Sequence, residues 1–478
     1  MMGHQPPPDD PLFSYHVQLE VRVRKDHPLR RLKECIDFEF IYKEVADTYG
    51  ASGNVSVPPP VILKLMLLLV LYNVRSEREL METIPERLDW LWFLDYTIDT
   101  VIPDHSVLSK ARKRWGEKTF KRFFQTIVSQ CVEAGLIDGE KIFIDSSFIH
   151  ADASRSSLVE RRHLDVAYEE LEKRLEEYPR APLNNRYVSS TDPDASMMRH
   201  GENASLRYKT HRAVDGAHEV ITAVEVTPGI INEAVKLNDM LDSHATNTGI
   251  KARTVVADMK YGIVDNFLAC HDCHVTAHIK PLADRVDPKR KALFAQDRFT
   301  YDAASDTYTC PKTHLLTRRT QIGDWVIYAA KAATCRTCEL REQCTTNRTG
   351  RTTRRHVRQD ILSAMYTIGR SRDAKRNLRT RQHLMERSFA QGVYFGMKDA
   401  RWRRLWRVQI QEYLVATVQN IRILIKATKG RFQGIGSKKG ESGRTRQLAL
   451  FTITSLLPRR AMSLCADAEC FFMCPGHH

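Results

Sequence analysis

Lys141-Ile142-Phe143-Ile144-Asp145-Ser146-Ser147 is the stretch of sequence that decides the fold. The spacing of apolar residues changes here from a helical period to that of a strand, and the run predicts a buried strand ending at Asp145. A second run, Thr254-Val255-Val256-Ala257-Asp258, is likewise an apolar, β-branched stretch that ends in an Asp. We therefore expect two carboxylates at the ends of two buried strands.

Strands and helices alternate around these two runs, which indicates an α/β core. Residues 207–226 alternate like a hairpin that turns at Asp215-Gly216. Residues 158–178, with heptad-like leucines, predict an exposed helical excursion. The remaining elements expected are helices near 232–243 and 264–271, a short strand at 275–279, and helices over 361–429.

The segment before the core, from about residue 28 to residue 135, has a helical pattern almost throughout. The turn Pro103-Asp104-His105-Ser106 leads into a helix over 107–115, which is a candidate DNA-contacting helix. A basic surface helix with no ligand is the equally good alternative. The cations on one side of this helix are Lys110, Arg112, Lys113 and Arg114.

The charge balance indicates a polyanionic partner. The chain has 73 Lys and Arg against 58 Asp and Glu, a net charge of +15. Nucleic acid is the commonest partner of such a chain, and an anionic membrane surface is the next. One basic run alone usually covers a solvated helix face, but this chain has six: 22–31, 110–122, 348–358, 370–381, 401–407 and 426–446.

No segment predicts export or a membrane span. The first ten residues lack a basic start and an apolar stretch, and the apolar run 61–71 is short and contains Lys64. We expect a cytoplasmic, nucleoid-associated protein. In a reducing compartment the 11 Cys favour metal ligands and buried thiols over disulfides.

Glu386 lies in a segment with helical periodicity, and Phe389, Ala390 and Val393 follow it at helical spacing. We expect this face to be packed, where an unpaired carboxylate is costly. Three converging carboxylates repel one another unless divalent cations lie among them. Asp145, Asp258 and Glu386 therefore form a candidate two-metal site, although an Asp at a strand end is often only a helix cap.

Several ordered motifs resemble those of bacterial insertion-sequence transposases of the DDE class. The resemblance covers roughly residues 20 to 428, and its N-terminal part is similar to the helical domain that many of these transposases carry. The motifs are Pro103-Asp-His-Ser106, Phe143-Ile-Asp-Ser-Ser-Phe-Ile-His-Ala-Asp-Ala-Ser154, Thr191-Asp-Pro-Asp-Ala195, Tyr208-Lys209, Val255-Val-Ala-Asp-Met-Lys-Tyr-Gly262 and Glu386-Arg-Ser-Phe-Ala390.

The resemblance implies a ribonuclease-H-like mixed sheet in which Asp145, Asp258 and Glu386 hold two Mg²⁺ or Mn²⁺ ions. One ion would activate water or a DNA 3′-hydroxyl, and the other would stabilise the leaving oxygen. The segment around Glu386 departs from the family pattern. Related transposases often have Tyr seven residues before the Glu, Arg four before and Lys seven after, where this chain has Arg379, Gln382 and Val393. Arg379 is the candidate substitute for phosphate binding, and Lys209 is a further DNA-binding candidate.

A cysteine cluster precedes the Glu386 helix. Cys335-Arg-Thr-Cys338, Cys344 and Cys310 supply four thiols that could close a tetrahedral zinc site, with His314 as a possible replacement ligand. Similar transposases carry a Cys-rich insertion at this place. The string Cys270-His-Asp-Cys273-His274 formally resembles a haem-attachment motif, but buried or helix-end thiols explain it better. The terminal Cys465, Cys470, Cys474, His477 and His478 are weaker metal candidates.

These features predict a transposase that binds the ends of an insertion sequence and catalyses strand cleavage and strand transfer, as a homodimer in its active complex. The alternatives are a metal-dependent nuclease without strand transfer and a catalytically inactive, transposase-derived DNA-binding protein. The expected divisions are a helical DNA-binding domain at 1–138, the first part of the core at 139–297, a zinc-ribbon-like insertion at 298–350, the second part of the core at 351–430 and a flexible basic tail at 431–478.

Overall fold

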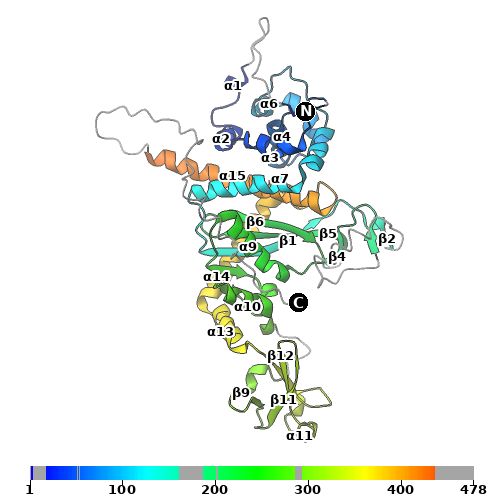
Figure 1. The fold of residues 1–478 in the computed structure, drawn as a ribbon, viewed down its shortest axis with the longest axis vertical. Coiled ribbons are helices and arrows are strands. Elements are labelled where there is room, and N and C mark those ends of the chain that lie inside the picture. The colour runs from blue at the N-terminus through cyan, green and yellow to red at the C-terminus, as the bar shows by residue number, and fades with distance from the viewer. Residues whose placement is uncertain are drawn as a thin grey trace, which may run out of the picture. The chain divides into compact units, whose positions relative to one another are not determined.

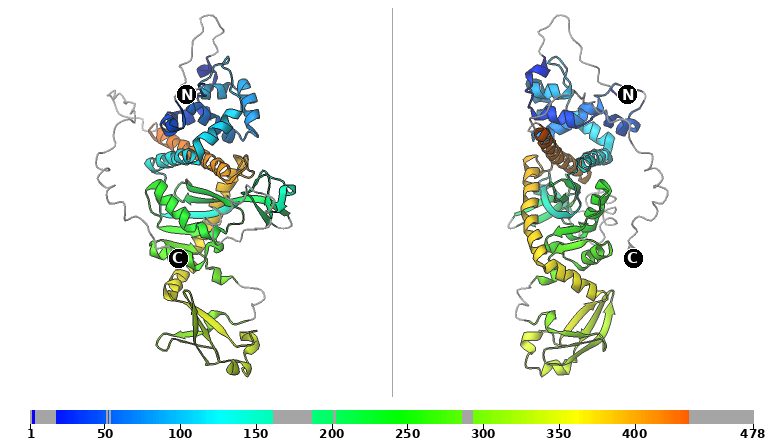
Figure 2. Two further views of the ribbon diagram at one scale, coloured as in Figure 1. Left: turned by 45° about the vertical axis from the view of Figure 1, so that its right-hand side comes forward. Right: turned by 90° about the vertical axis from the view of Figure 1, so that its left-hand side faces the viewer.

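The structure is a computed structural model that describes residues 2–3, 18–50, 52, 54–160, 187–200, 203–285 and 293–435. Contacts divide the chain into two compact units, Met1–Lys429 and Gly430–His478. The sheets and all helices except the end of the last one, Leu405–Ile435, belong to the first unit (Figures 1 and 2). Within the described ranges no helix is long and apolar enough to cross a membrane.

A six-stranded mixed sheet forms the centre of this unit. Strand β5 pairs antiparallel with β1, with β4 and with β6, while β7 and β8 continue the sheet on the far side of β1 as parallel neighbours. The predicted α/β core and the hairpin at 207–226 are confirmed. The strands are β1 (Lys141–His150), β4 (Ser196–His200), β5 (Asn203–Asp215), β6 (Ile221–Pro228), β7 (Thr254–Ala257) and β8 (Thr276–Ile279).

Strand β1 does not end at Asp145, so that prediction is wrong. Pairing with β5 continues to His150, because backbone hydrogen bonds to β5 support the strand along its whole length. Pairing with β7, in contrast, covers only Lys141–Phe143. Asp145 therefore lies in mid-strand, just beyond the part of β1 that β7 covers.

The two faces of the sheet bury alternate residues of the same strands, as strand geometry requires. One face packs Ile142, Ile144 and Ala213 against α9 (Leu237–Thr248), α10 (Val264–Asp272) and α13 (Gln359–Arg370). The other face packs Phe143, Val214 and Val256 against Leu384 and Met385 of α14 (Arg372–Tyr394). Figure 2 shows α14 and α9 on opposite sides of the sheet.

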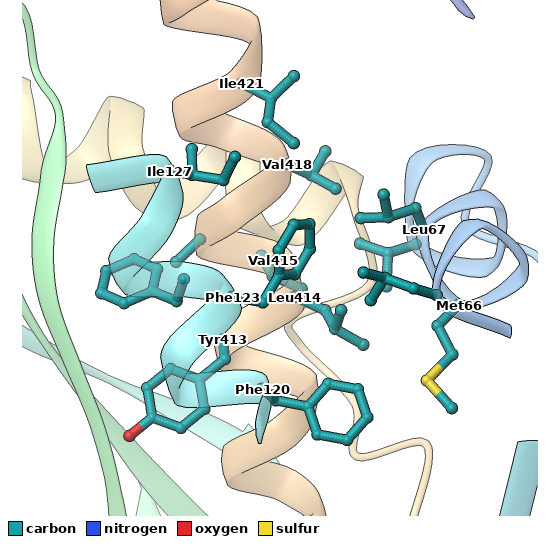
Figure 3. Close-up of a cluster of buried hydrophobic side chains, with 14 of the residues drawn as sticks. Met66, Leu67, Phe120, Phe123, Ile127, Tyr413, Leu414, Val415, Val418 and Ile421 are labelled. Carbon is teal, nitrogen blue, oxygen red and sulfur yellow. The ribbon is translucent and has the colours of Figure 1, made fainter. Parts of the chain in front are cut away.

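The helices before the sheet share one apolar core with α15 (Leu405–Ile435), the last helix of the described chain. Phe120, Phe123 and Ile127 of α7 lie against Leu414 and Val418 of α15 (Figure 3). The early helices are α1 (Leu19–Arg22), α2 (Pro28–Cys35), α3 (Phe40–Val45), α4 (Pro59–Leu71), α5 (Glu77–Thr83), α6 (Leu88–Leu94) and α7 (Ser106–Glu133).

A five-stranded antiparallel sheet with its own small core lies between β8 and α13 in the chain. Phe299, Tyr308, Leu316 and Tyr328 fill that core. The elements of this arm are β9 (Thr300–Asp302), β10 (Thr307–Thr309), β11 (Leu315–Ile322), β12 (Trp325–Ala329), α11 (Ala332–Arg336), α12 (Arg341–Cys344) and β13 (Thr352–His356).

Two further expectations change at the edges of the described chain. The helical excursion at 158–178 is wrong at its start, because Leu158–Glu160 is strand β2, paired with β3 (Tyr187–Ser189). Its remainder lies outside the described residues. The tail is expected from 431, but α15 continues to Ile435; residues 436–478 lie outside the described residues.

A fully buried ion pair joins the sheet to α14 and α15. Arg212 of β5 donates to Glu412 of α15 at 3.1 Å, and neither side chain is exposed to solvent. Arg212 also donates to the backbone oxygen of Ser388 on α14 and to Gln419 on α15, while Thr210 donates to Glu412. Removing one partner would leave an uncompensated charge in the core.

We expect Arg212→Met to lower the free energy of unfolding by about 3–5 kcal/mol, the typical cost of breaking a buried pair from one side. The double variant Arg212→Met/Glu412→Leu should be more stable than the single variant, because no buried charge is left. Urea denaturation followed by circular dichroism measures both. Arg376→Met, which removes an exposed pair with Asp373, is the control. If Arg212→Met were as stable as Arg376→Met, this would contradict the stabilising role of the buried Arg212–Glu412 pair.

Candidate active site

Asp145 and Asp258 lie near each other on the face of the sheet that α14 covers. Phe143 of β1 and Val256 of β7 are partners in register, and each Asp comes two residues later, on the same face. Burial raises the pKa of Asp145; the Arg381 guanidinium acts in the opposite direction, and the nearby Asp258 carboxylate raises it further. Two carboxylates in this arrangement favour a bound cation.

Each of these aspartates also accepts a local hydrogen bond. The backbone N–H of Ser146 donates to Asp145 Oδ1 at 2.8 Å, and that of Lys260 donates to Asp258 Oδ1 at 2.9 Å. Asp258 caps the short 3-10 helix Met259–Tyr261, as expected for an Asp at the end of a strand that acts as a helix cap. Capping engages one oxygen of Asp258 and is compatible with a ligand on the other.

Arg381 of α14 is the counter-charge of Asp145, with Nη1 2.5 Å from Oδ2. Both side chains are largely buried, with 14% and 24% of their surface exposed, and Arg381 Nε is buried without a hydrogen-bond partner. Sequence reasoning missed this residue. The signal was the helical spacing Asn377, Arg381, Met385, Ser388, which is the stripe of α14 that faces the sheet.

Glu386 lies outside this stripe and is exposed. Gln382 Nε2 donates to its carboxylate at 3.2 Å. The prediction of a packed face around Glu386 is wrong, because Ala390 is exposed and Val393 keeps 43% of its surface in solvent; only Phe389 is partly buried. Across the described residues, no three His, Cys, Asp or Glu side chains are grouped closely enough to hold a metal ion. The structure thus brings Asp145 and Asp258 together without Glu386.

Lys209 is buried beside this site, which corrects its prediction as a direct DNA contact. Its ammonium group donates to Glu233 at 2.6 Å and to the backbone oxygen of Ile231 at 2.7 Å. Lys260, which is mostly exposed, donates to the other oxygen of Glu233 at 2.7 Å. Burial alone would raise the pKa of Glu233, but the two lysines hold it at about 2.

The candidate DNA-contacting helix is the first part of α7, which breaks at Gly116. Lys110, Lys113 and Arg114 are exposed, as is Arg379 on α14. Arg112 is not available to DNA, because it is buried against Glu77 and stacks 3.9 Å over the Trp402 ring. That part of the prediction is wrong.

The four cysteines Cys310, Cys335, Cys338 and Cys344 gather at one end of the arm as free, partly buried thiols. Burial raises the pKa of Cys344, and the neighbouring thiols Cys335, Cys310 and Cys338 raise it further. Cys344 is therefore within electrostatic range of the other three thiols. The backbone of His314 accepts a hydrogen bond from that of Cys310. The grouping is looser than a formed metal site.

Cys270 and Cys273 agree with the interpretation as a buried and a helix-end thiol rather than a haem-attachment motif. Cys270 is buried in α10, and burial raises its pKa to about 12, while Cys273 is a partly buried thiol at the end of this helix. Cys465, Cys470, Cys474, His477 and His478 lie outside the described residues.

Comparisons with known proteins place two regions of the chain. Residues 17–114 match the family model of a transposase domain (DUF772), and residues 309–425 match that of a transposase DDE domain. The second match includes Glu386, and it ends within α15. No curated protein matches the chain.

Two solved structures show a distant likeness. A piggyBac transposase synaptic complex with hairpin DNA is 8% identical, with 87% of this chain and 75% of that chain covered at a TM-score of 0.35. A Mos1 transposase paired-end complex with the left transposon end is 10% identical, with 54% and 69% covered at a TM-score of 0.17. The two family-model matches cover separate parts of the chain, and both support a DDE transposase.

Proposed function

We propose that this transposase binds the ends of its element, cuts the DNA strands there and transfers the freed ends to target DNA, with divalent cations at Asp145, Asp258 and Glu386. The observation that carries the proposal is the pair of aspartates on adjacent strands with a guanidinium between them and α14. The strand order, with β6, β5 and β1 antiparallel and β7 and β8 parallel to β1, supports the ribonuclease-H-like core that the sequence resemblance implies.

The residues present fit a divalent cation. Carboxylate oxygens are the ligands that Mg²⁺ prefers, and Arg381 already supplies positive charge at this place. When bound, the cations would activate the attacking hydroxyl and stabilise the leaving oxygen. The chain's own residues supply the rest: the sheet fixes the two aspartates, α14 carries Glu386, and Lys260 offers a cation to a DNA phosphate beside them.

Arg381 and Glu386 lie on the same helix, five residues apart and on different sides of it, so a rearrangement of α14 that brings Glu386 to the aspartates would also move Arg381. We propose that Asp145, Asp258 and Glu386 would hold the cations when they are bound, with Asp145 released from its ion pair with Arg381. Arg381 is then free to contact a phosphate oxygen of the DNA. The unpartnered Nε of Arg381 supports this second role.

The aspartates should be essential. Asp145→Asn and Asp258→Asn are expected to lower Mg²⁺-dependent nicking of a supercoiled plasmid that carries the element ends by more than about a hundredfold, because each removes a metal-binding oxygen. Glu386→Gln should do the same if Glu386 is the third ligand. Asp373→Asn, an exposed site on α14, is the control. Nicking retained by the purified Asp145→Asn protein would refute the assignment.

Arg381→Met should bind divalent cations more tightly than the unaltered protein, because the guanidinium no longer competes for Asp145. A loss of about 1 kcal/mol of competition corresponds to roughly a fivefold lower Kd for Mn²⁺ in titration calorimetry. Arg376→Met keeps the same change of charge and length on the same helix, and its Kd should not change. Weaker Mn²⁺ binding by Arg381→Met would show that Arg381 supports the site in another way.

Because Glu386 is exposed and apart from the two aspartates, there is one alternative function: a transposase-derived protein that binds DNA but does not cut it. The nicking assay separates this alternative from an enzyme. A joining assay with precut element ends separates a transposase from a nuclease, because a nuclease would not join the ends to a target. Bringing two element ends together also requires at least a dimer in the active complex. We propose that this complex acts on DNA at the bacterial nucleoid.

We propose that Cys310, Cys335, Cys338 and Cys344 bind a structural zinc ion that rigidifies the arm, with the thiols closing around the ion. Protein purified without chelator should then hold about one zinc per chain, the content of a four-ligand structural site, measured by mass spectrometry of the metal. Cys338→Ser should lose most of this zinc. Cys273→Ser, a partly buried thiol outside the arm, should keep it. Zinc-free protein, or equal loss in both variants, would exclude the site.

A further inference from the structure

The fold holds the two aspartates of the candidate site in different ways. Asp145 lies within β1, which is paired with β5 along its length. Asp258 directly follows β7 and begins the short 3-10 helix Met259–Tyr261. We call residues 258–262 the Asp258 turn. Pairing of β1 with β7 ends at Phe143, two residues before Asp145. The position of Asp258 relative to Asp145 therefore depends on what holds this turn in place.

Three charged side chains in a row connect the Asp258 turn to β5. Lys209 of β5 donates to Glu233 Oε2 at 2.6 Å, and Lys260 of the turn donates to Glu233 Oε1 at 2.7 Å. Lys209 and Glu233 are nearly buried, with 7% and 9% of their side-chain surfaces exposed, whereas Lys260 is 69% exposed. We call these three residues the lysine–glutamate bridge. One buried carboxylate thus joins a central strand to the segment that carries Asp258.

The bridge lies on the opposite face of the sheet from the two aspartates. Lys209 is the register partner of Phe148 on β1. Phe148 comes three residues after Asp145, so their side chains point to opposite faces. The bridge therefore reaches Asp258 through the backbone of the turn, and it takes no part in any reaction at the aspartates.

Lys260 connects the bridge to the Asp258 carboxylate within a single residue. Its ammonium group pairs with Glu233, and its backbone N–H donates to Asp258 Oδ1 at 2.9 Å. The hydrogen bond to Glu233 raises the pKa of Lys260 against the effect of partial burial, and Asp258 and Asp145 raise it further. Fixing the Lys260 side chain restricts its N–H as well, and with it the direction of the Asp258 carboxylate.

A buried amide ties the same two segments together a second time. Asn266 Nδ2 donates to the backbone oxygens of Ala234 and Tyr261, at 2.8 and 2.9 Å. Tyr261 itself is fully buried in the core on the α9 side. These contacts fix the backbone at the end of the turn. The bridge fixes Lys260, the residue whose N–H contacts Asp258.

Stability alone does not account for the bridge. Apolar side chains of similar volume usually stabilise a core as well as a buried ion pair does, so Lys209 and Glu233 are a costly way to fill this space. What the pair adds is an ionised carboxylate that can orient a third group. That group is Lys260.

We propose that Glu233 and Lys260 are positioning residues of the metal site, and that the lysine–glutamate bridge holds the Asp258 carboxylate near Asp145 in the metal-free protein. This inference rests on the proposed function, because it assumes that the aspartates bind divalent cations. Groups that orient a metal ligand from outside the ligand shell typically contribute about 10–100-fold in affinity.

The sign of the change in metal affinity tests the proposal. Lys260→Met removes a positive charge that interacts with both aspartates, so by charge alone it should tighten Mn²⁺ binding, as expected for Arg381→Met. If Lys260 positions Asp258, the variant instead binds Mn²⁺ roughly tenfold more weakly in titration calorimetry. Lys260→Arg, which can keep the pair with Glu233, should bind as the unaltered protein does. Lys121→Met, which removes an exposed cation of α7, is the control.

Glu233→Gln tests the centre of the bridge. It keeps the size of the side chain and removes the charge that pairs with both lysines, so Mn²⁺ binding should again weaken roughly tenfold. This variant leaves Lys209 buried without its counter-charge, which can destabilise the fold. Lys260→Met leaves the Lys209–Glu233 pair intact, so its result stands even if Glu233→Gln does not fold.

Hydrogen exchange tests the turn directly, without metal and without DNA. A peptide spanning residues 255–263, followed by mass spectrometry, should exchange faster in Lys260→Met and Glu233→Gln than in the unaltered protein, because the turn is held less firmly. Exchange in β5 should stay the same. Faster exchange throughout the core would indicate a general loss of stability and would overturn the positioning role.

The remaining outcomes separate this proposal from the proposed function. Mn²⁺ binding by Lys260→Met that is tighter than, or equal to, that of the unaltered protein would overturn the positioning role alone. If the unaltered protein does not bind Mn²⁺, or if Asp145→Asn binds it equally well, the proposed metal site is rejected. The hydrogen exchange of the turn still shows in that case whether the bridge holds Asp258.

Discussion

The register of β1 between β5 and β7 is the constraint on which the site depends. β1 is paired antiparallel with β5 along almost its whole length and parallel with β7 over only three residues. This difference in pairing leaves the later half of β1 open on one edge, and Asp145 meets Asp258 where that open part begins. A slip of β7 by one residue would turn Asp258 to the other face. Backbone hydrogen bonds therefore set the distance between two charged side chains.

Helix α14 adds a cation and a carboxylate to this geometry, on different sides of the helix. Its buried stripe contacts β8 through Asn377, β1 through Arg381 and β5 through Ser388. Its outer side carries Arg379 and Glu386 in solvent. One helix thus holds a cation against the aspartates and a carboxylate away from them, which is a stable charge arrangement without metal.

The sequence predicted the core well because burial and periodicity are local signals. The β-branched runs before Asp145 and Asp258 and the hairpin turn at Asp215-Gly216 each determine their own backbone, and the structure has strands there. Pairing partners are not local, so the continuation of β1 to His150 could not be read from its own residues. The exposure of basic side chains was the least predictable feature. Arg112 and Lys209 are buried because they form ion pairs with Glu77 and Glu233, which lie in other segments of the chain.

Contacts between elements distant in the chain also explain what was missed at the site. Arg381 contacts a residue 236 positions earlier. The helical spacing of Asn377, Arg381, Met385 and Ser388 places it on the buried side of α14, but this spacing does not identify Asp145 as its partner. The cysteines of the arm were found easily because their spacing in the chain is itself the signal. Zinc binding also depends on the geometry of the four side chains, which their spacing in the chain does not determine.

The Arg212–Glu412 pair has a consequence for the order of events during synthesis. The two residues are 200 positions apart in the chain. At the usual rate of about 5–20 residues per second, Arg212 is made roughly 10–40 s before its counter-charge. Until then β5 cannot be buried beneath α14 and α15 without a charge left alone in the interior. The face of the sheet that carries the aspartates is therefore covered only after α14 and α15 have been made, so a fragment that ends before α15 would not bury Arg212.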